Sequence, residues 1–317
     1  MRRRTTSVAI ALLALAGTLV PVSAQTGAAF LDLGMGARAP GMGGALSAQV
    51  TGAEAVYYNP AGLAAQQGHA VLASVQPMSL DRTHATLAAA MNLRGGLAFG
   101  LTWIHASAGA IDARTGSGDV VGSIDDAQRA IGFALGTKIN ERVRIGGSFK
   151  VLNHEIDVPG TGTSTASGRA IDVGAQIEIR PQWQVAVGAR NLLGKLSWDV
   201  RRAASQSSAS EDDLPPTPYV GLGGAWHHFT FGVDAELFDM GGIAQPRLHL
   251  GAEADLSPML SLRAGMHRIG DADGLGLPSL GISIRPMHRE ALQLHYAWVA
   301  DDLGAGGRSI LSVGGVF

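Results

Sequence analysis

Hydrophobic and polar residues alternate with a period of two in segment after segment along most of the chain. In residues 169–180, for example, Ile171, Val173 and Ile177 fall on one phase, whereas Asp172 and Glu178 fall on the other. Successive side chains of a β-strand point to opposite faces, so each segment would present one apolar and one polar face. Alternation sustained over about ten residues is typical of transmembrane β-strands.

Fourteen segments follow this pattern. They lie near residues 69–77, 82–93, 97–107, 126–138, 143–155, 169–180, 184–193, 217–226, 229–238, 246–256, 260–268, 277–286, 291–300 and 308–317. The pattern therefore predicts an all-β fold, a 14-stranded antiparallel transmembrane β-barrel over residues 69–317. An even number of strands would place both ends of the barrel wall on the same side of the membrane.

The connections between these segments alternate in length, which is a second and independent indication. Short turns are expected at residues 94–96, 140–142, 181–182, 227–228, 257–259 and 286–290, and most of the connections between them are longer, at residues 108–125, 156–168, 194–216 and 269–276. Bacterial barrels have short periplasmic turns and longer outer loops. The connection at residues 194–216, rich in Ser, Ala and acidic residues, is predicted to be a mobile outer loop.

Charged residues within the strands fall on the polar phase, which would face the lumen. These lumen charges are Lys150, Asp172, Glu178, Asp234, Glu236, Glu253, Asp255, Arg263 and Arg285. An Arg or Lys side chain facing lipid near the membrane midplane would cost about 2–4 kcal/mol, so the lumen is the favourable place for it. Such charges either form a packed polar interior that holds the barrel together or line a path through it, and the sequence leaves both interpretations open.

The two ends of the chain carry export signals. Three arginines at positions 2–4 precede an apolar stretch at residues 8–20 and a small-residue site at residues 22–24, which together predict a signal peptide over residues 1–24. An N-terminal anchor helix is the alternative, but it needs about 20 apolar residues, and Pro21 interrupts the stretch too early. The final strand ends on Phe317, which resembles the ending that the barrel-assembly machinery of the outer membrane reads.

Composition is compatible with an exported barrel. The chain has 44 Gly, no Cys and 16% charged residues, so it was not built around disulfides. Its net charge is −2, and removing the three arginines of the signal peptide leaves 21 basic against 26 acidic residues, a net charge of −5. This balance argues against nucleic acid as a partner. The mean hydropathy of +0.16 is high for a soluble chain with this much glycine and is natural for strands that face lipid.

Residues 25–68 show no sustained alternation and are predicted to form a small hatch inside the barrel. Gly-rich turns within residues 34–45 and 59–64 bracket a short helical stretch of small residues at 53–58, and such a segment can fold compactly only inside another structure. A barrel of about this size has a lumen wide enough to need filling.

Two blocks in this region carry a resemblance to a known family. Residues 36–45 read GARAPGMGGA, and residues 53–63 read AEAVYYNPAGL. They resemble the start of the PorV/PorQ family of outer-membrane proteins, within the superfamily that resembles the long-chain fatty-acid transporter FadL. The resemblance is specific over residues 36–63 and only architectural elsewhere. It implies a fourteen-stranded barrel with a hatch, serving either in protein secretion of the type IX kind or in the uptake of apolar molecules.

The residues of these blocks are the candidate site. They are Arg38, Met42, Gly43, Gly44, Tyr57, Tyr58, Asn59, Pro60 and Gly62. Pro60 fixes its own φ and moves Asn59 out of the helical region, so the Asn59 side chain can bond the nearby backbone and lock a turn. The block would then either anchor the hatch to the wall or lie on a ligand path.

Catalysis finds little support in the sequence. No His pair with a neighbouring acid has the spacing of a metal site, no serine is singled out as a nucleophile, and the Gly-rich turns do not follow a strand in a βαβ unit. No enzyme, metal or cofactor is therefore expected. Three functions remain: a secretion barrel that binds cargo proteins or other secretion components at its outer loops, a transporter of hydrophobic ligands, or a structural barrel. The expected surroundings are the lipid of the outer membrane and the barrel-assembly machinery.

Overall fold

The structure is a computed structural model that describes residues 27–202, 206–239, 244–270, 276–286, 291–301 and 307–317. The predicted signal peptide, the tip of the 194–216 connection and most of the 269–276 and 286–290 connections lie outside these ranges. No helix among the described residues is long and apolar enough to span a membrane.

Antiparallel strands make up most of the molecule. Their bounds are β1 (Ala70–Met78), β2 (Arg82–Asn92), β3 (Leu97–Arg114), β4 (Val120–Lys138), β5 (Val143–Val158), β6 (Gly162–Arg180), β7 (Trp183–Arg202), β8 (Gln206–Leu214), β9 (Thr217–Trp226), β10 (Phe229–Asp239), β11 (Ala244–Ser257), β12 (Leu260–Ile269), β13 (Leu277–Ile284), β14 (Gln293–Val299) and β15 (Arg308–Val316). A short 3-10 helix, η5 (Arg94–Gly96), forms the turn between β2 and β3.

The strands close into a barrel with fourteen wall positions. Each strand pairs with its neighbours, and β1 pairs with β15, with Ala70 opposite Val316, so that the first and last strands close the ring. The strands β8 and β9 share one position, because β8 pairs with the second half of β7 and β9 with the first half. Pro215 and Pro216 separate the two, and proline cannot donate to a strand ladder. The predicted fold class and strand count are confirmed.

The wall buries small residues and exposes large apolar ones. Along β4, Ala130, Gly132 and Ala134 are buried toward the lumen, whereas Ile131 and Phe133 are 43% and 45% exposed on the outside. This is the reverse of a protein that folds in water, where large apolar side chains gather inside. An outer surface of this kind requires an apolar solvent such as the interior of a bilayer.

Three of the longer connections, at residues 108–125, 156–168 and 194–216, are extended hairpins rather than loops, which corrects the sequence-based prediction. The strands β3, β4, β6 and β7 run for 18 to 20 residues, whereas β12 to β15 run for 7 to 10. In the connection at residues 194–216, predicted to be mobile, β7 continues to Arg202 and β8 pairs back against it. Hydrogen bonding between the two arms of each hairpin explains the error, since polar residues can extend a ladder beyond the apolar band.

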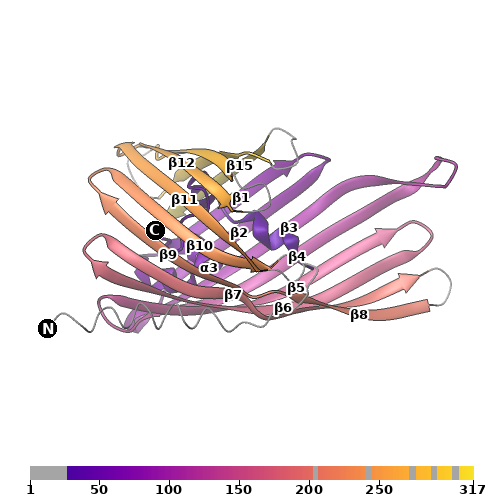
Figure 1. Ribbon diagram of the computed structural model, residues 1–317, viewed down its shortest axis with the longest axis horizontal. Coiled ribbons are helices and arrows are strands. Elements are labelled where there is room, and N and C mark those ends of the chain that lie inside the picture. The colour runs from indigo at the N-terminus through magenta and orange to yellow at the C-terminus, as the bar shows by residue number, and fades with distance from the viewer. Residues whose placement is uncertain (1–26, 203–205, 240–243, 271–275, 287–290, 302–306) are drawn as a thin grey trace.

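The barrel is therefore tall on one side and low on the other. About 9–11 residues suffice for a strand to cross a bilayer, so the hairpins of β3–β8 project well beyond one end of the barrel. Figure 1 shows these hairpins reaching further than the rest of the wall. We call this end the loop end. The opposite end, which carries the short turns and both ends of the barrel wall, we call the turn end.

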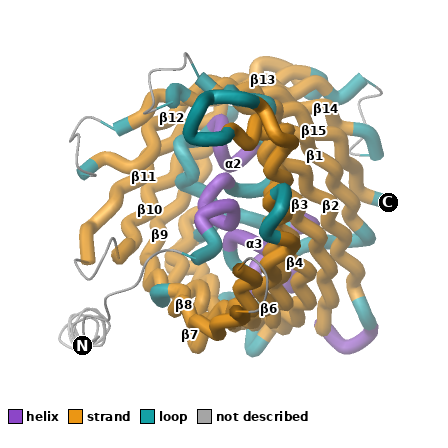
Figure 2. The backbone as a smooth tube through the Cα atoms, turned by 90° about the vertical axis from the view of Figure 1, so that its right-hand side faces the viewer, coloured by secondary structure: helices purple, strands orange, loops and turns teal. Residues whose placement is uncertain are grey.

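The segment before β1 lies inside the barrel as a chain of short helices. Their bounds are η2 (Ala29–Leu33), α2 (Arg38–Gly41), η3 (Gly52–Glu54), α3 (Ala55–Tyr58) and η4 (Pro60–Ala65), where η denotes a 3-10 helix. In Figure 2 these helices lie within the ring of strands. The predicted compact hatch corresponds to this segment, which we call the hatch.

Strand pairing in the wall shifts register between β3 and β4, between β11 and β12, and along β7, where both edges of the strand are affected. The pairing of β7 with β6 shifts register on both sides of Ile171, and Asn191 and Leu193 adopt φ values of 57° and 54°. These values lie in the left-handed region, which side-chain-bearing residues seldom adopt. On its other edge, β7 pairs with β9 up to Arg190 and with β8 only from Gly194 onward. Residues 191–193 thus form the least regularly paired part of the β7 ladder.

Candidate functional site

Inward-facing glycines of the wall provide the seat for the hatch. A Cβ atom added to Gly232 would lie 2.1 Å from the carbonyl oxygen of Ala45, and one added to Gly251 would lie 2.2 Å from that of Met42. Distances this short do not occur between real atoms, so only glycine allows the hatch backbone to approach the wall here. Further glycines with hatch atoms within 2.7 Å of such a Cβ are Gly100, Gly136, Gly146, Gly174, Gly221, Gly223 and Gly265.

The first half of the hatch, residues 34–50, is held to β11 and β12 by charged and polar side chains. We call it the latched half. Arg38 forms an ion pair with Glu253, with 3.0 Å between Nη2 and Oε1, and the carboxylate raises the pKa of the guanidinium above its ordinary value. His267 donates from Nε2 to the carbonyl of Pro40 at 2.7 Å, and His249 donates from Nδ1 to the carbonyl of Gly43 at 2.8 Å.

Strand β10 adds a second set of polar contacts to the same half. Asp234 accepts hydrogen bonds from the backbone N–H groups of Leu46 and Ser47 at 3.1 and 2.8 Å, and from the Ser47 hydroxyl at 2.8 Å. The carboxylate thus accepts from two successive backbone N–H groups of the hatch. Gly43 N–H donates to the hydroxyl of Ser279 on β13 at 3.2 Å. The predicted site residues Met42, Gly43 and Gly44 all lie in this half and are packed against the wall.

The second half, residues 51–65, is held mainly by close packing against β3–β6, and we call it the packed half. A Cβ on Gly100 would lie 2.4 Å from the Val56 side chain, and one on Gly146 would lie 2.4 Å from the carbonyl carbon of Pro60. Gly62 packs as closely against the backbone of Val50, where an added Cβ would lie 2.2 Å from its oxygen. Backbone and apolar atoms therefore make most of the contacts of this half.

Asn59 is the polar centre of the packed half and is fully buried. Its Oδ1 accepts a hydrogen bond from Ala61 N–H at 3.1 Å, which is the turn lock expected from the sequence. Its Nδ2 also donates to the carbonyls of Ser47 at 3.0 Å and of Ala175 on β6 at 3.3 Å. Gln176 donates to the carbonyls of Ser47 and Val50 at 3.1 and 3.0 Å. One side chain thus joins the two halves of the hatch to the wall.

The two tyrosines Tyr57 and Tyr58 hold residues 31–35 of the hatch in place. Their rings meet edge to face with centroids 4.7 Å apart. Tyr58 accepts from the Met35 N–H at 2.9 Å and bonds its carbonyl at 3.0 Å, and Tyr57 donates to the carbonyl of Leu31. Burial raises the pKa of the Tyr57 hydroxyl, so the group stays protonated and remains a donor.

An apolar surface lines the lumen on the loop-end side of the hatch, and the sequence analysis did not single it out. Phe30 and Leu31 of η2 pack there against wall residues from β3 to β8. We call the wall residues Ile104, Leu152, Leu196 and Leu214, together with Trp198 at their edge, the apolar patch. The sequence could have predicted this patch. Ile104, Leu152 and Leu196 are large apolar residues on the strand face that otherwise carries small or polar residues.

Two cavities flank the hatch. The outer cavity, toward the loop end, has a volume of about 80 Å³ and is lined by four arginines, two histidines and three acidic residues. Among them, Arg190 pairs with Glu236, which also lies 3.3 Å from His249. This volume holds a few water molecules and is too small for a drug-sized ligand, which needs about 300–1,000 Å³. The inner cavity, toward the turn end, has a volume of about 360 Å³ and a strongly polar lining.

The remaining predicted residues lie in the wall. Lys150 and Asp172 form a buried ion pair with 2.9 Å between Nζ and Oδ1, and Lys150 also bonds Asn191 at 2.7 Å. Glu178 is half-buried near the turn end of β6. Glu253, Asp255, Arg263 and Arg285 line the inner cavity. Phe317 is 69% exposed, and its backbone closes the barrel through two hydrogen bonds with His69.

The geometry is that of a plugged barrel, and among the described residues no group of three or more His, Asp or Glu side chains is placed to hold a metal ion. The predicted hatch residues and lumen charges come together, because Arg38 reaches Glu253, and Ser47, next to the Gly-rich block, reaches Asp234. The assignment of these residues to an anchor or to a ligand path stays a prediction.

Comparison with known proteins identifies the architecture. Neither a protein-family model nor a curated protein matches the chain. The CymD monoaromatic hydrocarbon channel matches with a TM-score of 0.63 and 13% identity, over 90% of this chain and 98% of that chain. A FadL homologue of Pseudomonas aeruginosa matches with a TM-score of 0.62 and 11% identity, over 88% and 97%. The P. putida toluene transporter TodX matches with a TM-score of 0.62 and 12% identity, over 90% and 99%.

At these identities the likeness establishes the fold alone, a closed antiparallel β-barrel. The FadL-like superfamily stays an expectation from the sequence. The narrower PorV/PorQ assignment stays a prediction.

Proposed function

We propose that this chain is a channel that admits small apolar molecules across the outer membrane of a bacterium. The apolar patch is the observation that carries the proposal, because apolar side chains on the lumen face of a barrel do not serve water or ions. The names of the similar structures, two of which describe carriers of monoaromatic hydrocarbons or toluene, point to the same class of ligand.

A membrane location follows from the outer surface of the barrel. Large apolar side chains are exposed all around the wall, and aromatic side chains stand near the turn end, among them Trp183, Trp226 and Phe317. Aromatic girdles mark the membrane interfaces of outer-membrane barrels, and short turns mark the periplasmic side. We therefore assign the turn end to the periplasm and the loop end to the outside, with Phe317 as the assembly signal.

The N-terminal segment of the hatch occupies the place of the ligand. Phe30 and Leu31 fill the apolar patch much as a small apolar molecule would, and the bond between Tyr57 and the Leu31 carbonyl keeps them there. A ligand would have to displace this segment, which spans only one short helix. We infer that exchange between η2 and the ligand controls occupancy of the patch.

The inner cavity is an unfavourable exit for an apolar molecule. Charged side chains line it, and an apolar molecule gains nothing by leaving the patch for a polar space. The irregular part of β7, residues 191–193, lies beside the patch residues Leu196 and Leu214. We infer that the ligand leaves the patch sideways there, toward the apolar interior of the membrane.

Uptake of toluene by cells that produce the protein tests the proposal. Cells with the wild-type barrel should take up labelled toluene faster than cells with an empty vector. Leu152→Asn should remove most of this gain, because it places a polar amide in the patch. The matched control is Ile156→Asn on the same strand, outside the apolar cluster, and it should keep the gain. Equal uptake by both variants and the wild type would refute the apolar patch as the ligand site.

Protein secretion remains a second candidate, and the tall side of the barrel favours it. The hairpins of β3–β8 project beyond the lipid-facing band and offer an extended surface to secreted proteins. Residues 36–63 carry the resemblance to PorV/PorQ that motivates this function.

Shortening one hairpin separates the two candidates. Deleting residues 112–121, at the tip of the β3–β4 hairpin, removes projecting surface and leaves the apolar patch intact. A channel should keep its toluene uptake after this deletion. A secretion barrel should lose secreted proteins that copurify with it from the outer membrane.

A further inference from the structure

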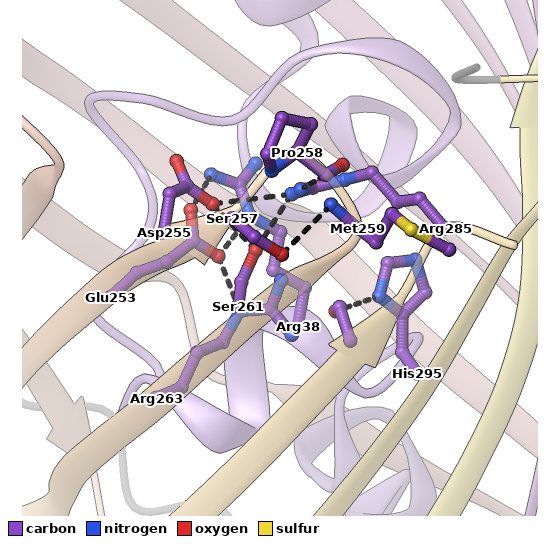
Figure 3. A network of polar contacts seen from close by, with 11 residues as sticks. Arg38, Glu253, Asp255, Ser257, Pro258, Met259, Ser261, Arg263, Arg285 and His295 are labelled. Carbon is purple, nitrogen blue, oxygen red and sulfur yellow. Dashed lines mark hydrogen bonds and ion pairs between the residues drawn. The ribbon is translucent and has the colours of Figure 1, made fainter. Parts of the chain in front are cut away.

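The inner cavity brings three arginines together beneath the hatch. Arg38 enters from α2, Arg263 from β12 and Arg285 from just beyond β13, and all three line the same space of about 360 Å³. Figure 3 shows these side chains in one network with Glu253 and Asp255 of β11. The site is separate from the apolar patch, which lies on the other side of the hatch.

The arginines outnumber the carboxylates that pair with them. Arg38 and Arg263 share the single carboxylate of Glu253, in two ion pairs. Arg285 pairs with Asp255 at 3.4 Å and donates to Ser261 at 2.8 Å. Three cations thus face two anions in a partly enclosed space. Because an uncompensated charge away from bulk water is costly, the arrangement favours a further negative charge.

Glu54 of the hatch is a third acid that lines the cavity. Its Oε1 is buried without a hydrogen-bond partner among the described residues, and so is the Nη1 of Arg263. Burial raises the pKa of Glu54 to about 7, against the opposing effect of Arg38 and Arg263. Below neutral pH the carboxyl group is therefore mostly neutral and supplies no counter-charge.

The charged and titratable groups that line the cavity with Glu54 come from the hatch and from the β11–β14 part of the wall. They are Arg38 from α2, Glu253 and Asp255 from β11, Arg263 from β12, Arg285 from beyond β13 and His295 from β14. The side chains of Arg38 and Arg285 are 25% and 21% exposed, so they can meet an entering ligand directly.

We propose that the inner cavity binds a small anion, an oxyanion or a carboxylate group, held by the guanidinium groups of Arg38, Arg263 and Arg285 in competition with ionised Glu54. The neutral carboxyl group of Glu54 leaves the positive charge of the cavity available to the anion and can donate a hydrogen bond to it. Ionised Glu54 becomes the counter-charge itself and repels the anion. Anion binding and ionisation of Glu54 therefore exclude each other.

Sulfate is a suitable probe because its charge stays constant near neutral pH. Calorimetric titration of sulfate into the full-length barrel, in a non-ionic detergent at low salt, should show binding at pH 6. The affinity should fall about tenfold between pH 6 and pH 8, because the fraction of neutral Glu54 falls by that factor for a pKa of about 7. Absence of sulfate binding at pH 6 would refute the site.

Three variants tie the binding to these residues. Glu54→Gln keeps a neutral side chain at every pH, so sulfate affinity at pH 8 should match that at pH 6. Arg285→Gln leaves the Arg38–Glu253–Arg263 contacts in place and should weaken sulfate binding at least tenfold in a folded barrel. Arg142→Gln, in an exposed turn outside the cavity, is the matched control and should bind as the wild type does.

Two results would overturn the proposal: normal sulfate binding by Arg285→Gln, or an unchanged pH dependence in Glu54→Gln. Folding of each variant is checked by its heat-modifiable migration on gels.

The anionic group could belong to a free molecule or to a lipid headgroup, and a second arm of the experiment distinguishes them. Sulfate is titrated at pH 6 into the barrel in non-ionic detergent, without lipid and with phosphatidylglycerol added. If a lipid phosphate fills the cavity, the added lipid should compete and lower the sulfate affinity severalfold. Equal affinity with and without the lipid assigns the site to a free anion.

Discussion

Both halves of the hatch lie against wall glycines, but they differ in how many charged and polar contacts hold them as well. The latched half, residues 34–50, is held by ion pairs and hydrogen bonds from β10–β13, with Arg38 and Glu253 at its centre. The packed half, residues 51–65, is held by the fit of its backbone against wall glycines of β3–β6. Polar contacts respond to charge and pH, whereas packing responds to volume. We therefore expect the latched half to open first, and the packed half to remain as a fixed base.

The comparison can be measured because the chain has no cysteine. Ala48→Cys places a single cysteine in the latched half, and Ala64→Cys places one in the packed half. Both sites are buried. The rate at which a thiol reagent labels each cysteine reports how often that half opens. Heat-modifiable migration gives the thermal midpoint of the whole barrel.

The largest effect is expected from Glu253→Gln. The substitution leaves Arg38 and Arg263 close together without their shared carboxylate, and breaking a buried ion pair on one side costs about 3–5 kcal/mol. Labelling of Ala48→Cys should rise far more than labelling of Ala64→Cys. Arg38→Met is the milder comparison, because Glu253 keeps Arg263 as a partner. A similar rise at both cysteines would show that the hatch opens as one unit.

Gly146→Ala tests the packed half. The new methyl group would lie 2.4 Å from the carbonyl carbon of Pro60, and such overpacking costs about 3 kcal/mol. Labelling of Ala64→Cys should rise and the thermal midpoint should fall. The adjacent Gly147→Ala is the control, since its methyl group would meet only the Asp172 carbonyl oxygen at 3.5 Å. Equal midpoints for the two variants would contradict the seating of the hatch on Gly146.

Asn59→Ala tests the contact that joins the halves. It removes the acceptor for Ala61 N–H and the donor to the carbonyls of Ser47 and Ala175, at a cost of about 2 kcal/mol. If Asn59 is a structural anchor, its replacement by Ala should lower the thermal midpoint of the barrel. Toluene uptake should then fall only in proportion to the amount of folded protein lost. Reduced uptake per folded barrel with an unchanged midpoint would place Asn59 on the ligand path instead.

The smallest effect is a pH dependence that originates at Glu54. Its pKa is raised from 4.5 to about 7 in the closed hatch, so its contribution to stability is fully present below pH 4.5 and is lost as the pH rises through 7. The thermal midpoint of the wild type, in the absence of added anion, should therefore fall relative to that of Glu54→Gln between pH 5 and pH 8. Parallel midpoints for the two proteins over this range would exclude Glu54 as the titrating group.

The sequence alone was sufficient to predict a β-barrel and to assign polar side chains to the phase that faces its lumen. Strand periodicity has a period of two whatever the tertiary arrangement, so Ile171 and Asp172 could be assigned to opposite faces without coordinates. The strand count followed from the same rule. The hairpin extensions could not be predicted, because residues such as those of β8 are polar on both faces and carry no periodic signal.

The tertiary structure decided which groups meet. In the sequence, Gly232 and Gly251 look like ordinary small residues of the lumen face. They contact the hatch backbone at Ala45 and Met42, which lie almost two hundred residues away or more along the chain. Arg38 and Glu253 are 215 residues apart in sequence and form an ion pair only because the hatch lies inside the closed barrel. Local periodicity fixes the face of each side chain, but the partner across the lumen is set by closure of the ring, which no local pattern encodes.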